Sequence, residues 1–110
     1  VAHEVPFQKG MVISNEPGYY EHNWGGIRLE NLYFVKNNDL FNDHPGGRRW
    51  LSLETLTLIP FERKLIDRDF LSSEEIQWLD DYHIRVFEEL SPLLKNTEDV
   101  KWLKSACGFN

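Results

Sequence analysis

Two stretches decide the fold of this chain: GMVISNEPGYY at residues 10–20 and GIRLENLYFV at residues 26–35. In the first stretch, MVISN favours β structure, Pro17 then keeps Glu16 out of helical geometry, and Gly18 permits a positive φ. The second stretch is rich in β-branched and aromatic residues and predicts one longer strand. We therefore expect an antiparallel pair of strands joined by the Gly- and aromatic-rich connection GYYEHNWGG.

Alternation along a strand divides the second stretch into two faces. One face is predicted to carry Arg28, Glu30, Leu32 and Phe34, and the other Ile27, Leu29, Tyr33 and Val35. Glutamates before a turn or within a strand are usually solvated surface groups. Glu30, however, has bulky apolar neighbours on both sides, and Arg28 on its own face could pair with it or hold it in position. A buried carboxylate needs a cation, and here the candidates are Arg28 or a metal.

The second half of the chain predicts one more strand and two helices. Turn-forming residues over 37–50 predict an exposed loop, and ETLTLIP, residues 54–60, predicts a third strand. Ser72 and Glu75 have the spacing of a capping box, which predicts a helix over 73–90. A shorter helix is expected over 98–106, with Asn96 or Thr97 as its cap and Gly108 as its stop.

Composition limits the class of protein. The chain has 110 residues, 41% of them hydrophobic, which suits one small core. A net charge of −6, a pI of about 5.1 and scattered basic residues argue against nucleic-acid binding. The single cysteine suits a reducing, cytoplasmic compartment. We see no apolar run of about 20 residues and no secretory leader, so no membrane partner is expected. Because the chain begins with Val1, we expect it to be a piece of a longer polypeptide.

The two glutamate stretches resemble a known family. GMVISNEPGYY followed by GIRLENLYFV is similar to the last metal-binding segment of Xaa-Pro aminopeptidases, the aminopeptidase P group of the pita-bread metallopeptidases. LETLTLIPFERKLID and EIQWLDDYH resemble the C-terminal extension of the longer, three-domain members. The resemblance covers about residues 6–103, and it favours an aminopeptidase P over a dipeptide-cleaving prolidase.

The resemblance implies roles for four residues. Glu16 and Glu30 match two of the family's five ligands to a pair of divalent metals, commonly manganese. Tyr20 and Arg28 match the tyrosine and arginine that line the site and orient the ligands. Carboxylate oxygens suit a pair of hard dications, which would supply hydroxide for attack on a peptide carbonyl. The implied reaction is hydrolysis that releases an N-terminal residue preceding proline.

The implied fold is α+β, the C-terminal portion of a pita-bread catalytic domain, with antiparallel strands followed by a helical extension. We place the end of the catalytic domain at residues 1–60 and the extension at residues 61–110. The family's two aspartate ligands and one histidine ligand lie upstream, and Asp39 and Asp43 follow the glutamates and cannot replace them. The chain alone is therefore expected to bind metal weakly and to be inactive.

Histidines offer no substitute for the missing ligands. HEVP is similar to a family segment whose histidine contacts the substrate, but the spacing is too short, so His3 is expected to be exposed. His22 and His44 are expected to be solvated, and His83 to take part in packing or an interface.

Two alternatives to the peptidase interpretation remain open. The chain could belong to a pita-bread relative that has lost catalysis and serves as a binding module. It could also be a stand-alone dimerisation or interaction domain. Long aminopeptidases P are often dimers, and the apolar face of the 73–90 helix, with Trp78 and Leu79, is expected to form core or a homodimer surface.

Overall fold

The computed structural model describes residues 5–41 and 49–109, and the chain divides into two compact units, residues 1–57 and 58–110. Within its described part, the first unit contains β1 (Val12–Asn15), β2 (Gly18–Glu21), β3 (Gly25–Arg28), β4 (Asn31–Asn37), a 3₁₀ turn (Asp39–Phe41) and β5 (Leu51–Thr55). The second unit contains α1 (Ser73–Leu90), α2 (Thr97–Ala106) and three 3₁₀ turns. Antiparallel strands followed by helices confirm the predicted α+β class.

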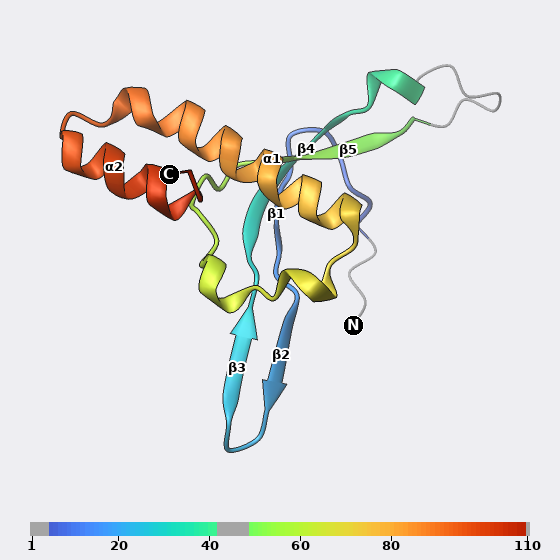
Figure 1. Cartoon of the computed structure of the whole chain (residues 1–110). Helices are drawn as coiled ribbons and strands as arrows, with labels where there is room; N and C mark the ends of the chain where they lie inside the picture. The colour runs from blue at the N-terminus through green and yellow to red at the C-terminus, as the bar shows by residue number, and fades with distance from the viewer. Residues whose placement is uncertain (1–4, 42–48, 110) are drawn as a thin grey trace. The chain divides into compact units, whose positions relative to one another are not determined.

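One register runs through most of the first unit. β1 pairs with β4 and β2 pairs with β3, and in both ladders the numbers of facing residues add to 46, as for Val12 with Phe34 and Gly18 with Arg28. Between the ladders, the Leu29 N–H donates to the Pro17 carbonyl at 3.0 Å, which carries the register across the gap. The two ladders thus form one long hairpin, which ends beyond β2 and β3 in a tight turn (Figure 1).

The prediction of a single strand over 27–35 was wrong in one respect, because the strand breaks between β3 and β4 at Leu29 and Glu30. Pro17 faces Leu29 and has no N–H, so this pair makes one hydrogen bond where an ordinary pair makes two. The residues predicted as a connection are themselves paired, since β2 lies within them. Asn23 at φ 62° and Gly25 at φ 131° allow the turn.

β5 begins and ends earlier than the third strand predicted over 54–60. It begins at Leu51, opposite Asn37, because β4 extends into the segment that was predicted as loop. It ends at Thr55 because Thr57 Oγ1, a side-chain atom, accepts the Leu32 N–H at 2.8 Å. This bond replaces a ladder hydrogen bond and ends the regular pairing. Residues 42–48, in the middle of the predicted loop, lie outside the described residues.

Both predicted helices are confirmed. α1 covers the predicted residues 73–90, and Ser72 and Glu75 form both hydrogen bonds of the capping box, at 3.2 and 2.8 Å. α2 starts one residue earlier than predicted, with the Asn96 side chain accepting the Glu98 N–H, and Gly108 at φ 91° follows its end. These boundaries were predictable because caps are local features. No helix in the described residues combines the length and apolar character that crossing a bilayer requires.

The core of the second unit lies between the two helices and the segment that leads into them. Its buried members are Tyr82, Val86, Leu103 and Cys107, with Leu58, Phe61, Phe87, Leu90, Leu94 and Phe109 packed around them. α1 and α2 run antiparallel as a helical hairpin (Figure 1). Leu79 is buried, as predicted for core, whereas Trp78 is 51% exposed and stacks on Tyr82 with ring centroids 5.7 Å apart.

Two side chains of α1 attach the entering segment to the helix. The Tyr82 hydroxyl donates to the Ile59 carbonyl at 2.7 Å and accepts from the Ile59 N–H at 3.3 Å. His83, 2% exposed, accepts the Phe61 N–H at Nε2, 3.1 Å away. The expected packing role of His83 is confirmed, and the acceptor nitrogen must be unprotonated for this bond to form.

Burial lowers the pKa of His83, and the nearby positive charge of Arg63 acts in the same direction, while Asp80 opposes it. The folded pKa therefore lies below the unfolded value of about 6.5. Stability is unaffected by this group above about pH 6.5 and decreases as the pH falls toward the folded pKa, because only the unfolded state takes up the proton.

We predict that His83→Gln removes this pH dependence, because the glutamine Oε1 can accept the Phe61 N–H without titrating. The unmodified chain should lose up to about 1.4 kcal/mol of unfolding free energy per pH unit below pH 6.5, and the variant should lose less. Denaturant titrations of both chains at pH 7 and pH 5 measure the difference. Identical losses of unfolding free energy in the two chains would contradict the assignment of this pH dependence to His83.

Candidate metal centre

The hairpin register places the two predicted ligand residues opposite each other. Continued across the gap between the ladders, the register sets Glu16 against Glu30. Because the neighbouring Pro17 and Leu29 form a hydrogen-bonded position, Glu16 and Glu30 occupy a non-hydrogen-bonded one, where facing side chains come closest. Both point to the face that carries Tyr20 and Arg28, since these residues lie an even number of positions away.

Arg28 lies between the two carboxylates. Its Nε lies 2.9 Å from Glu30 Oε2 and its Nη1 lies 3.8 Å from Glu16 Oε2, so Arg28 forms an ion pair with each carboxylate. The side chains of Glu16, Glu30 and Arg28 are 48%, 41% and 48% exposed. The predicted proximity of Arg28 and Glu30 is thus present, and the cation offsets the repulsion between two carboxylates that face each other.

Tyr20 lies over the same face of the hairpin. Its hydroxyl accepts a hydrogen bond from Arg28, and this bond, followed by the charge of Glu30, raises the pKa of Arg28. The ring covers two glycines: a methyl group on Gly18 would lie 2.7 Å from the Tyr20 hydroxyl oxygen, and one on Gly26 would lie closer still to the ring. Glycine at both positions therefore leaves room for the tyrosine to reach the guanidinium.

Ser14 is a further residue of this cluster that the sequence reasoning missed. Its hydroxyl donates to Glu16 Oε1 at 2.6 Å. The signal was available, because Ser14 lies two residues before Glu16 and so on the same strand face. A serine two residues from a glutamate is too common a pattern to attract attention without the contact.

The donor set fits part of a divalent metal site. Two carboxylates supply hard oxygen ligands of the kind that Mg²⁺ and Mn²⁺ prefer. In the described part of the chain, no three or more His, Cys, Asp or Glu side chains come together in a way that could hold a metal ion. His22 is exposed in the turn after β2, as predicted, while His3 and His44 lie outside the described residues. The described residues therefore do not complete the predicted set of five ligands.

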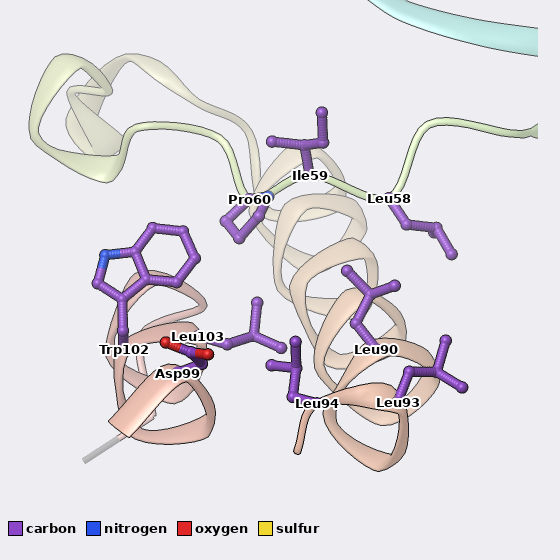
Figure 2. Close-up of a pocket in the computed structure, with 9 residues that line it drawn as sticks. All are labelled: Leu58, Ile59, Pro60, Leu90, Leu93, Leu94, Asp99, Trp102 and Leu103. Atoms are coloured by element: carbon purple, nitrogen blue, oxygen red, sulfur yellow. The ribbon is translucent and has the colours of Figure 1, made fainter. Parts of the chain in front are cut away.

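A second candidate site is an apolar groove in the second unit, with a volume of about 430 Å³. Figure 2 shows Leu58, Ile59 and Pro60 of the entering segment opposite side chains at the end of α1, after it, and on α2. Asp99 is the one charged residue among those lining it. Ile59, Leu93 and Trp102 are each more than 60% exposed. Such a lining suits recognition of an apolar surface, not catalysis of hydrolysis.

Two family models match most of the chain. The family model for metallopeptidase family M24 matches residues 1–37, and the model for the C-terminal region of peptidase M24 matches residues 49–108. The chain belongs to metallopeptidase family M24. Within that family it corresponds to the C-terminal part of an aminopeptidase P, as the next comparisons show.

Aminopeptidase P2 of Arabidopsis thaliana is 45% identical over 99 residues, which are 90% of this chain and 14% of that protein. Aminopeptidase P1 of Lotus japonicus is 43% identical over 103 residues, 93% of this chain and 15% of that protein. A crystal structure of X-prolyl aminopeptidase from Caenorhabditis elegans, described as a cytosolic enzyme with a di-nuclear active site, superposes with a TM-score of 0.80 at 33% identity.

That superposition covers 94% of this chain and 17% of the Caenorhabditis elegans chain. The chain therefore spans about one seventh to one sixth of the length of these relatives. The resemblance to aminopeptidases P and the pita-bread origin of the strands are confirmed. The roles of Glu16, Glu30, Tyr20 and Arg28 stay predictions.

We predict that Gly26→Ala displaces the Tyr20 ring and costs roughly 1 kcal/mol of stability, as overpacking does. In a Tyr20→Ala background the same substitution should cost less, because the ring is gone and only the Tyr19 carbonyl oxygen, 3.1 Å from the added methyl group, remains close to it. Denaturant unfolding of the four chains of this double-mutant cycle provides the measurement. An equal cost in both backgrounds would show that the ring does not lie over Gly26.

Proposed function

We propose that the protein to which this chain belongs is a Xaa-Pro aminopeptidase that uses two divalent ions, manganese in particular, to hydrolyse the bond between an N-terminal residue and a following proline. The observation that carries this proposal is the placement of Glu16 opposite Glu30 with Arg28 between them. The di-nuclear active site of the Caenorhabditis elegans relative supports it.

In this proposal Glu16 and Glu30 bind the ions, and Arg28 holds the Glu30 carboxylate through the 2.9 Å ion pair at Nε. Tyr20 in turn holds the guanidinium, which keeps Arg28 in reach of both carboxylates. The bound ions would supply a Lewis acid and a nucleophile for the hydrolysis of the peptide bond. The contribution of this chain is orientation, since its four residues share one face of the hairpin.

We propose that the chain is inactive by itself. Two divalent ions carry four positive charges, and two glutamates offset only two of them. The remaining ligands would come from the upstream part of the polypeptide, which in the relatives makes up most of the length. In the same scheme residues 1–60 end the catalytic domain and residues 61–110 form its extension; the division of the chain into compact units at residues 57 and 58 supports a boundary near this point.

We predict that Glu16→Gln and Glu30→Gln, each made in the full-length protein, reduce metal-dependent cleavage of a Xaa-Pro peptide more than 100-fold. This is beyond the roughly 10–100-fold typical of residues that only support ligands. The matched control is Glu21→Gln, on the other face of the same hairpin beside Tyr19, which should leave the rate unchanged. Initial rates with added Mn²⁺ measure all three variants.

Two results would count against the peptidase. Full-length protein that cleaves no Xaa-Pro peptide in the presence of Mn²⁺ would favour the non-catalytic homologue. Equal losses in Glu16→Gln, Glu30→Gln and Glu21→Gln would indicate a general effect of charge on the hairpin and not ligand loss.

We further propose that the full-length protein acts in the cytoplasm as a homodimer. The single cysteine of the chain and the cytosolic Caenorhabditis elegans relative support the location. The exposed apolar side chains around the groove in the second unit support self-association, because contiguous apolar surface marks interaction sites.

Trp102 is the side chain expected to matter most for the dimer, since exposed tryptophans are frequent binding hot spots. We predict that Trp102→Glu weakens dimerisation at least about 10-fold. Phe70→Glu introduces the same charge at an 87% exposed position outside the groove and should have no effect. Sedimentation equilibrium of the full-length variants measures the dissociation constants, and a monomeric unmodified protein would exclude the dimer.

A further inference from the structure

Ser14 makes a contact that none of the functional assignments above uses. Its hydroxyl donates to Glu16 Oε1 at 2.6 Å, within the range of a charge-assisted hydrogen bond between a hydroxyl and a carboxylate. Ser14 is the next-to-last residue of β1, close to the gap between the two ladders, where Glu16 itself belongs to no strand. Ladder hydrogen bonds therefore do not restrain Glu16, and its carboxylate needs another restraint to keep one orientation.

The two oxygens of Glu16 have different surroundings. Oε1 accepts from Ser14, whereas Oε2 is the atom nearest Arg28, at 3.8 Å and without a hydrogen bond. The hydroxyl thus selects one rotation of the carboxylate and turns Oε2 toward the face where Glu30 and Arg28 lie. Glu30, in contrast, forms an ion pair with Arg28 Nε at 2.9 Å.

We propose that Ser14 is a positioning residue, whose hydroxyl fixes the Glu16 carboxylate so that Oε2 is presented to a divalent cation. This inference rests on the proposed metal-binding role of Glu16. A carboxylate that is already oriented loses less rotational freedom when it binds a cation than one that turns freely. Hydrogen bonds to ligating carboxylates have this effect in metal sites, and their loss commonly weakens metal affinity 10–100-fold.

The hairpin supplies a matched control. The Tyr19 hydroxyl donates to Glu21 Oε2 at 3.1 Å, again from a hydroxyl to a carboxylate two residues later, but on the opposite face. Tyr19→Phe removes that bond as Ser14→Ala removes the first. Any general effect of deleting a hydroxyl from this hairpin will appear in both variants, while an effect on the cation should appear only in Ser14→Ala.

The experiment is calorimetric titration of Mn²⁺ into metal-free full-length protein. We expect Ser14→Ala to weaken Mn²⁺ binding about 10-fold or more, Ser14→Thr to restore it because threonine keeps the hydroxyl, and Tyr19→Phe to bind like the unmodified protein. Circular dichroism of each variant verifies that the fold is retained, and the Thr variant keeps the test valid if the Ala variant is destabilised.

The outcomes separate the two proposals. If the unmodified protein binds Mn²⁺ and loses binding in Glu16→Gln, but Ser14→Ala binds as tightly, the positioning role of Ser14 is wrong and the metal site stands. If Ser14→Thr fails to restore the affinity, the hydroxyl is not the group that matters, and the inference is overturned. If Glu16→Gln also leaves binding unchanged, the proposed ligand itself is wrong.

Discussion

The arrangement of the first unit depends on one constraint, the single hairpin register that pairs β1 with β4 and β2 with β3. Side chains alternate between faces with a period of two, so a slip of one residue would carry every member of the cluster to the other face or out of opposition. In the observed register Glu16 faces Glu30, and the charge of Arg28 between them makes this opposition of two carboxylates tolerable.

Pro17 interrupts the hairpin without changing its register. Because it lacks an N–H, the ladder loses one hydrogen bond beside Glu16 and Glu30, and both residues lie outside the strands. Side-chain contacts replace the missing backbone restraint: Ser14 contacts Glu16, and Arg28 contacts Glu30. The site combines strands that set direction with a short irregular stretch whose carboxylates are oriented by neighbouring side chains, an arrangement suited to binding a cation.

In the second unit, side chains of α1 form hydrogen bonds with the backbone of the irregular segment that leads into the helix. Tyr82 and His83 bond to the backbone of Ile59 and Phe61, so polar groups of this segment have partners although it forms no strand. The core lies beneath it, and apolar residues along the edges, including Trp102, stay exposed. Apolar surface of this kind is consistent with a unit that in its relatives forms a small part of a much longer protein.

The sequence alone determined the features whose causes are local. The capping box and the Asn96 cap located both helices, and the two glutamate motifs identified the family and the candidate ligands. The details of strand pairing were decided only in the tertiary structure, because a partner strand lies far away in sequence. Three features depend on this pairing: the position of β2 within the predicted connection, the break at Leu29, and the early start of β5. The contact of Ser14 with Glu16 required coordinates as well, since spacing places two side chains on one face but does not orient their atoms.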